Sequence, residues 1–212
     1  MRPALWPIVA VALLTIVGTA YWRLAAARSH ASPTVRTHIE ISGEKFDLDN
    51  RYLGARREDG GIELAAFFPN FAPAGDIGDI TAHTDIDDRF GHLVFVGLKP
   101  ADPKLDPAER TARLYLRFLD ETSWSHPGGL VARAFEPGSP FEGDELFFVP
   151  PEGRLFSARC HRSDPSRNLP NTCIAVFRAG AVDAQVRFSA DLLSDWEAVM
   201  KGAHGLIEAA RR

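Results

Sequence analysis

Hydrophobic residues follow one another almost without interruption from Leu5 to Leu24, unlike anywhere later in the chain. The segment contains no Asp, Glu or Lys, and its one charged residue, Arg23, lies next to its end. About 20 residues in an α-helix span roughly 30 Å, the thickness of the hydrocarbon core of a bilayer. Tyr21, Trp22 and Arg23 suit the interface, where aromatic rings lie at headgroup depth. The pattern predicts a transmembrane helix over residues 5–24 after a short tail, residues 1–4.

A cleaved signal peptide is the alternative interpretation of this segment. Small residues at 18–20 and at 25–27 would allow cleavage. Signal peptides have a shorter apolar core, of about 7–15 residues, and no belt of aromatic residues and arginine at its end. The length and the belt therefore favour a retained anchor.

The direction of the anchor does not follow from its flanking charges. The α-amino group and Arg2 precede the segment, and Arg23 and Arg28 lie at its other end, so the charges nearly balance. A short tail followed by a large domain is the usual signal-anchor arrangement. We therefore expect the N-terminus inside the cell and the domain outside.

Alternation of apolar and polar residues resumes after a linker, residues 25–34, and it predicts a series of β-strands. A Gly-containing turn at residues 178–181 predicts a hairpin between the last two. The predicted strands cover residues 35–41, 46–48, 62–68, 92–98, 130–135, 145–149, 155–160, 174–177 and 182–188.

Two helices are predicted in the same region. Asp106 suits an N-cap, Pro107 the first helical position and Glu109 the capping box, which predicts a helix over residues 107–120. The alternative there is a strand through the apolar residues Leu114, Leu116 and Phe118. Residues 122–129 are predicted as a turn-rich connection.

The second predicted helix closes the chain, capped near Ser189 and running from about Asp191 to Ala210. Its apolar residues recur at the spacing of a helix that packs one face on a core. Residues 35–212 are therefore predicted to form one α+β domain, with a mainly antiparallel sheet and a C-terminal amphipathic helix.

Charge and composition narrow the classes of function. The whole chain has a net charge of −4, and its first 30 residues contain three Arg and no acid. The remainder therefore holds 21 basic and 28 acidic residues, a net charge of −7. An acidic domain lacks the basic surface that nucleic acid binding requires, so no nucleic acid partner is expected. A hydrophobic content of 45% argues against disorder.

The two cysteines, Cys160 and Cys173, are 13 positions apart and enclose a segment rich in turn-forming residues. In an oxidising compartment such a pair forms a disulfide, which favours a domain outside the cytoplasm. Two free thiols in a cytosolic domain are the alternative. A zinc site with His161 lacks a fourth ligand nearby.

The search for catalytic motifs is mostly negative. The chain contains no nucleophile elbow, phosphate-binding loop, dinucleotide fingerprint or zinc-protease motif. Ser125 and His126, with Asp120 nearby, allow a serine hydrolase to be drawn, as do His83 and Asp85 for another hydrolase. Neither has an oxyanion element.

The acidic residues between positions 70 and 90 lack the spacing of a calcium loop. We therefore predict no catalytic residue, no metal site and no cofactor.

Three stretches carry a resemblance to a known group: residues 39–46 (Ile-x-Ile-x-Gly-x-x-Phe), residues 115–119 (Tyr-x-Arg-Phe-Leu) and residues 188–196, which end in Asp-Trp. With them the chain resembles small single-span envelope proteins of proteobacteria that have no assigned function. The resemblance implies that the protein lies in a bacterial inner membrane, and it indicates no functional site.

These observations lead to one functional hypothesis and one alternative. The hypothesis is a non-enzymatic periplasmic domain, anchored in the bilayer by residues 5–24, that binds a protein or another envelope component. Its specific version is an inhibitor or immunity-type protein that meets an incoming enzyme. The alternative is an envelope hydrolase with an unrecognised site.

Overall fold

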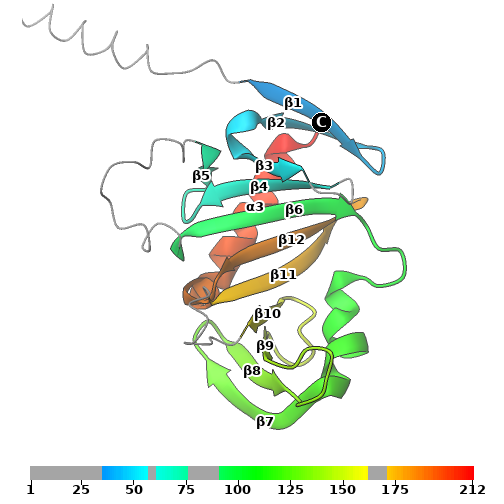
Figure 1. Ribbon diagram of the computed structural model, residues 1–212, viewed down its shortest axis with the longest axis vertical. Coiled ribbons are helices and arrows are strands. Elements are labelled where there is room, and N and C mark those ends of the chain that lie inside the picture. The colour runs from blue at the N-terminus through cyan, green and yellow to red at the C-terminus, as the bar shows by residue number, and fades with distance from the viewer. Residues whose placement is uncertain (1–34, 57–60, 76–90, 162–170) are drawn as a thin grey trace, which may run out of the picture. The chain divides into compact units, whose positions relative to one another are not determined.

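An antiparallel sheet dominates the computed structural model, which describes residues 35–56, 61–75, 91–161 and 171–212 (Figure 1). Ten strands of these ranges join it in the order β3-β4-β6-β12-β11-β10-β9-β8-β7, and β5 pairs with β4. The strands are β3 (Leu53–Arg56), β4 (Ile62–Phe67), β5 (Ala72–Pro73), β6 (Leu93–Pro100), β7 (Leu119–His126), β8 (Leu130–Phe135), β9 (Asp144–Phe148), β10 (Ser157–His161), β11 (Thr172–Ala179) and β12 (Val182–Ser189).

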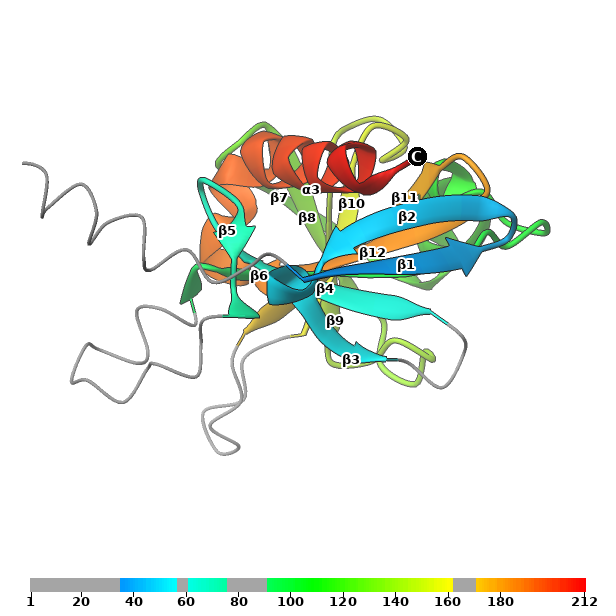
Figure 2. The same ribbon diagram turned by 90° about the horizontal axis from the view of Figure 1, so that it is seen from above.

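The helix α3 (Trp196–Ala210) covers one face of this sheet (Figure 2). Burial of apolar side chains between α3 and the strands stabilises the domain at about 25 cal/mol per Å². The main core forms here, and its members with no exposed surface include Leu64, Val94, Val96, Val182, Ala184, Val186, Val199, Ala203 and Ile207.

The hairpin of β1 (Arg36–Ile41) and β2 (Glu44–Asp49) is a separate two-stranded sheet that packs beside the end of α3. Phe46 is almost fully buried and forms a bridge with Arg211. The backbone N–H of Arg212 donates to the carbonyl of Lys45 at 3.0 Å. The last two residues of the chain therefore hold the first hairpin in place.

Short helical turns, rather than a long helix, cover the other face at the far end of the sheet. They are η3 (Pro107–Glu109), η4 (Thr111–Tyr115, a π-helical turn) and η5 (Leu116–Phe118). Tyr115 and Phe135 pack edge to face with ring centroids 5.6 Å apart. This second core consists of Tyr115, Leu119, Phe135, Leu146 and Phe148.

The structure confirms the α+β class, the mainly antiparallel sheet and the C-terminal helix. The nine predicted strands are present with shifted ends. Prediction missed the short strands β3 and β5 and the eight-residue edge strand β7, which replaces the expected turn-rich connection at 122–129. Six consecutive residues of β7 are exposed on both faces, so no apolar alternation marked it as a strand.

The predicted helix at 107–120 is present as consecutive helical turns from Pro107 to Phe118, which are 3₁₀ and π turns rather than a regular α-helix. The Asp106 side chain accepts a hydrogen bond from Ala108 N at 2.9 Å, as an N-cap does. Glu109 does not close the capping box, because its carboxylate pairs with Arg154. Leu119 already pairs with Phe135 as a strand residue, which ends the helical turns.

The C-terminal helix begins as predicted, with the Ser189 side chain accepting from Asp191 N at 3.3 Å. Its first six residues form the 3₁₀ turn η6 (Ala190–Asp195), and regular α-helix starts at Trp196. None of the helices within the described ranges is both long and apolar enough to cross a membrane. The predicted span over residues 5–24 lies outside those ranges, as do Tyr21, Trp22 and Arg23.

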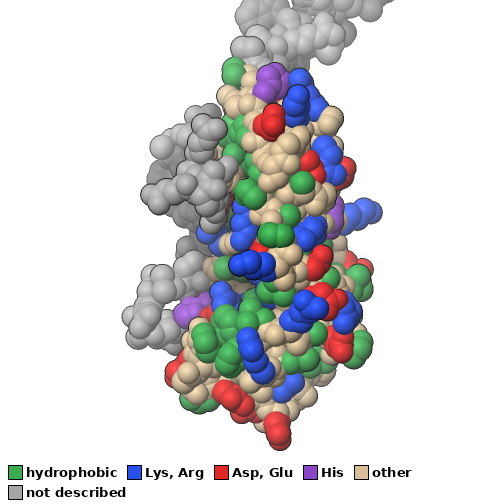
Figure 3. All heavy atoms as spheres, turned by 90° about the vertical axis from the view of Figure 1, so that its right-hand side faces the viewer, with side chains coloured by type: hydrophobic (Ala, Val, Ile, Leu, Met, Phe, Trp, Pro, Cys, Tyr) green, Lys and Arg blue, Asp and Glu red, His purple; other side chains and the backbone are tan. Residues whose placement is uncertain are grey.

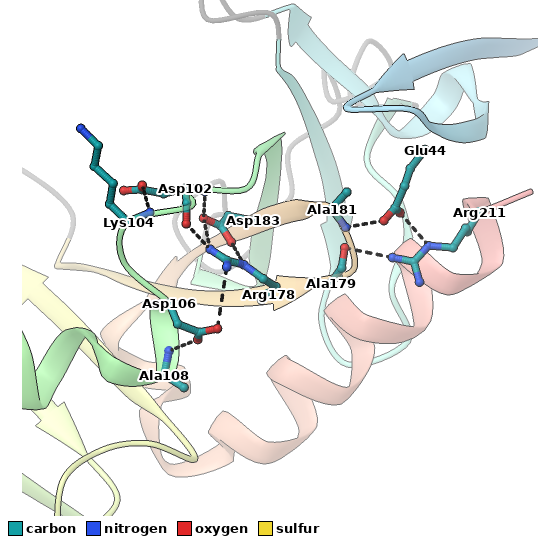
Figure 4. A network of polar contacts seen from close by, with 10 residues as sticks. All are labelled: Glu44, Asp102, Lys104, Asp106, Ala108, Arg178, Ala179, Ala181, Asp183 and Arg211. Atoms are coloured by element: carbon teal, nitrogen blue, oxygen red, sulfur yellow. Dashed lines mark hydrogen bonds and ion pairs between the residues drawn. The ribbon is translucent and has the colours of Figure 1, made fainter.

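A buried ion pair joins the β11–β12 hairpin to the segment after β6 (Figure 4). Asp183 has no exposed surface, and its Oδ1 accepts from Arg178 Nε at 2.8 Å. Its Oδ2 accepts from Asp102 N at 3.0 Å, and Arg178 Nη2 donates to the Asp102 carbonyl at 2.8 Å. These hydrogen bonds to Asp183 raise the pKa of the Arg178 guanidinium.

The tip of the same hairpin is bound to the first and last elements of the domain (Figure 4). The backbone N–H of Ala181 donates to the Glu44 carboxylate, and Arg211 Nη2 donates to the Ala179 carbonyl at 3.1 Å. Glu44 and Arg211 themselves form an ion pair at 3.1 Å. Gly180, between these contacts, has a φ of +62°, a conformation that glycine adopts without strain.

Candidate protein-binding surface

The face of the sheet opposite α3 has a hollow beside the part that η3–η5 cover. The hollow has a volume of about 490 Å³. None of the described helices covers it, because η3–η5 pack over β7–β9 and α3 packs on the opposite face. Its lining comes from four adjacent strands, β9 to β12, and consists of Asp144, Arg159, His161, Thr172, Ile174 and Arg187. We call this surface the sheet hollow.

The strand register aligns arginines across the sheet hollow. Arg159 on β10 is directly opposite Ile174 on β11, which is opposite Arg187 on β12. The row continues to Phe95 on β6, and on the other side Leu146 on β9 is opposite Arg159. Because side chains on neighbouring strands at one register position share a face, this row presents arginine on every second strand with an apolar residue between.

Asp144 contacts two side chains, those of Arg159 and His161, at one edge of the sheet hollow. Its Oδ2 lies 3.1 Å from Arg159 Nε, and its Oδ1 lies 2.9 Å from His161 Nδ1. The Asp144 side chain is 17% exposed, and those of Arg159 and His161 are 32% and 47% exposed. The carboxylate is thus largely enclosed, and the side chains of Arg159 and His161 reach solvent.

Arg187 is positioned from the opposite edge. Its guanidinium carbon lies 4.6 Å from the centre of the Phe95 ring, a cation–π contact. Its Nη2 lies 3.4 Å from both carboxylate oxygens of Glu63, a long contact for a charged pair. Stacking therefore contributes to the orientation of this guanidinium alongside the pairing with Glu63.

The disulfide lies directly behind the sheet hollow. Cys160 and Cys173 are bonded and occupy opposite positions of β10 and β11, in agreement with the predicted pairing. Both are buried on the α3 face. Their neighbours His161 and Thr172 point to the hollow, so the covalent bond fixes the two strands that carry its middle.

Comparisons with known proteins give one informative result. No family model matches the chain, and no curated protein matches it. A solved structure does: an immunity protein of the Stenotrophomonas maltophilia type IV secretion system, Smlt3025. The likeness has a TM-score of 0.60 at 12% sequence identity and covers 84% of this chain and 94% of that one. At this identity the likeness shows a shared fold alone.

A second, smaller hollow lies beside α3. It has a volume of about 290 Å³, and its apolar lining includes Leu155, Phe177 and Met200. The ring of His204 stacks on Phe177 with centroids 3.7 Å apart. Burial lowers the pKa of His204, which favours the neutral ring. We interpret this hollow as the edge of the hydrophobic core where it reaches the surface.

The residues weighed for hydrolase chemistry are not brought into a catalytic arrangement within the described chain. His126 Nδ1 bonds to the neighbouring Pro127 carbonyl at 2.9 Å, and its ring packs on Phe147. The Asp120 carboxylate accepts from Thr122 N at 2.7 Å rather than orienting His126. His83 and Asp85 lie outside the described residues. No group of three metal-binding side chains occurs in the described ranges.

Sequence reasoning missed the arginines of the sheet hollow. Arg159 and Arg187 occupy polar positions of alternating strands, and the pattern of each strand predicts this correctly. The sequence therefore indicates that each arginine lies on the face opposite the core residues of its own strand. Which residues of separate strands align across the sheet depends on register, and no sequence pattern within one strand gives it.

Proposed function

We propose that the domain is a non-enzymatic inhibitor of the immunity type, which binds an incoming protein through the sheet hollow. The fold shared with the immunity protein over 84% of this chain carries the proposal. Fold alone does not determine function, so the argument also needs a site. The sheet hollow offers one: a wide concave surface on the sheet, lined mainly by charged and polar side chains, with two arginines on either side of the apolar residue Ile174.

The composition of this surface suits a protein partner. Arginine is enriched in the residues that contribute most to protein–protein binding, and half-buried guanidinium groups next to apolar side chains are typical of such positions. On the side of the molecule shown in Figure 3, basic and acidic side chains are interspersed. That side has no continuous basic stripe of the kind that tracks a nucleic acid backbone.

We further propose that residues 5–24 anchor the chain in the bacterial inner membrane and that the domain lies in the periplasm. The apolar run supports the anchor, and the bonded cysteine pair supports an oxidising compartment. An inhibitor held there meets an incoming protein before that protein reaches its target.

A self-intoxication assay tests the immunity function. A strain lacking the chain is grown in contact with its parent, which still produces the incoming protein. We expect loss of viability in the mixed culture and none in isolation, with rescue by the full chain. Equal survival of the deletion strain and the parent would contradict the proposal.

The location is tested separately. In spheroplasts, added protease should degrade the domain, and thiol labelling should require prior reduction of the Cys160–Cys173 disulfide. Thiols that label without reductant in a protease-protected domain would exclude the periplasm. Alanine variants at His83, His126 and His161 address the hydrolase alternative, because a folded variant with lost function at His83 or His126 would favour an enzyme.

A further inference from the structure

We propose that the sheet hollow binds a single carboxylate side chain of the partner protein, held between Arg159 and Arg187 above Ile174. This inference rests on the proposed function and names the chemistry of the same site. Its basis is the register, which places these three residues in one row across β10, β11 and β12.

The spacing of the two arginines fits one carboxylate. Neighbouring strands are about 4.8 Å apart, so Arg159 and Arg187 start from backbone positions roughly 10 Å apart across Ile174. Arg159 contacts Asp144 and Phe141, and Arg187 contacts Phe95 and Glu63, so the two guanidinium groups border the hollow from opposite sides. Arginine side chains are long enough for both groups to reach a carboxylate placed between them. Each guanidinium presents parallel N–H donors that match the two oxygens of a carboxylate.

The donors that would bind the carboxylate are open. Asp144 contacts Arg159 at Nε, and within the described ranges the two Nη atoms of Arg159 have no hydrogen-bond partner. Arg187 uses Nη2 in its 3.4 Å contact with Glu63, and in the same ranges its Nε and Nη1 have none. Each guanidinium is thus oriented by its own pairing and retains N–H groups that point away from that pairing.

The floor of the site strengthens these donors. Ile174 is a half-buried apolar residue that provides a less polar surface between the arginines. Hydrogen bonds between charged groups are stronger where the surroundings are less polar. An arriving carboxylate would therefore gain more here than in an exposed pair.

The charge of the domain determines what kind of acidic partner fits. Residues 31–212 have a net charge of −7, so a broadly acidic protein would be repelled at long range. The partner accordingly presents an isolated Glu or Asp on a surface that is otherwise neutral or basic. Lysine would not replace the arginines, because its ammonium group lacks the planar fork.

Small probes test the chemistry without knowledge of the partner. The full chain in nanodiscs, labelled at isoleucine methyl groups, is titrated with N-acetylglutamate α-methylamide, whose only charge is the side-chain carboxylate. N-acetylglutamine α-methylamide is the neutral control of the same shape. We expect a saturable shift of the Ile174 methyl signal with the glutamate probe, at least tenfold larger than with the glutamine probe.

Three variants complete this measurement. Arg159→Gln/Arg187→Gln should abolish the shift, and Arg159→Lys/Arg187→Lys should weaken it at least fivefold. Arg154→Gln removes an equally charged side chain outside the sheet hollow and should leave the shift unchanged. Equal shifts with both probes, or an undiminished shift in the double glutamine variant, would overturn the inference.

Photo-crosslinking in the native host separates this inference from the proposed function. A photoreactive residue replaces Thr172 at the edge of the sheet hollow in the full chain. We expect a protein adduct whose yield falls about tenfold in Arg159→Gln/Arg187→Gln, and falls equally when one acidic residue of the captured protein is changed to its amide. An adduct that keeps its yield in the double variant overturns the carboxylate inference and leaves the proposed function intact. The absence of an adduct from folded protein overturns the sheet hollow as the binding surface, and with it both proposals at this site.

Discussion

Two of the arginine–aspartate pairs among the described residues differ in how deeply the aspartate is buried and in what surrounds the pair. Asp183 is fully buried, and Arg178 and a backbone N–H supply hydrogen bonds to both of its oxygens. Asp144 also uses both oxygens, but its partners Arg159 and His161 are substantially exposed and lie at an open hollow.

The difference shows how a pair is used for structure or for recognition. In the buried pair, Arg178 directs its Nη2 back to the Asp102 carbonyl, so the network closes on itself (Figure 4). In the exposed pair, Arg159 contacts Asp144 through Nε and stacks over the Phe141 ring, and its Nη atoms make no hydrogen bond to another described residue. Satisfied buried pairs stabilise a unique packing, whereas a partly engaged guanidinium at the surface can bind something else. We expect stability to depend on the first pair and binding on the second.

Among the variants that test this comparison, Asp183→Ala should lower the unfolding free energy most. Removing one partner of a buried pair leaves Arg178 and the Asp102 N–H without their acceptor, which costs about 3–5 kcal/mol of unfolding free energy. Urea unfolding followed by tryptophan fluorescence measures it. Asp144→Ala is the matched control and should cost less, about 1 kcal/mol, because its partners Arg159 and His161 reach solvent and stay hydrated when their acceptor is removed. Similar losses for both variants would remove the distinction between the two pairs.

Loss of the disulfide should have the next largest effect. Cys160→Ala/Cys173→Ala removes a bond that closes a loop of 13 positions, worth about 3 kcal/mol in the loop-closure treatment. Hydrogen exchange should show the lost protection concentrated in β10 and the adjoining end of β11. Protection at the β11–β12 tip, which Glu44 and Arg211 hold, should change little. Uniform loss across the sheet would show that the bond does not act locally on the hollow.

Neutralising the arginines of the sheet hollow should change stability only slightly. Arg159→Gln/Arg187→Gln removes exposed pairs and one cation–π contact, so we expect a loss of about 1 kcal/mol or less. The midpoints of thermal and of urea unfolding report it. A loss as large as that of Asp183→Ala would make these residues structural and would weaken the assignment of a binding surface.

The smallest effect concerns pH. Burial lowers the pKa of His204 in the folded state below its ordinary value of 6.5, so the unfolded chain binds more protons as pH falls below about 6.5. The contribution of this residue to stability is therefore present above that pH and is lost below it. His204→Gln should flatten the dependence of unfolding free energy on pH below about 6.5. An unchanged slope would show that His204 is not the group responsible.

Sequence patterns predicted the fold better than the site. Alternation identified nine strands because each has one face on a core, as the buried series from Val182 to Phe188 shows. The sequence pattern did not predict the edge strand β7, because neither of its faces is covered. The start of the helical turns at Asp106 was predicted from local capping, but their end depended on pairing between Leu119 and Phe135, which are 16 positions apart.

The sequence by itself determined the acidic domain, the paired cysteines, the apolar N-terminal segment and most of the strands and the closing helix. These features depend on composition or on periodicity within a few residues. Only the tertiary structure decided which face of β9–β12 stays open and that Arg159, Ile174 and Arg187 form one row. The physical reason is that strand register and the coverage of a face come from contacts between distant segments, which no local pattern records.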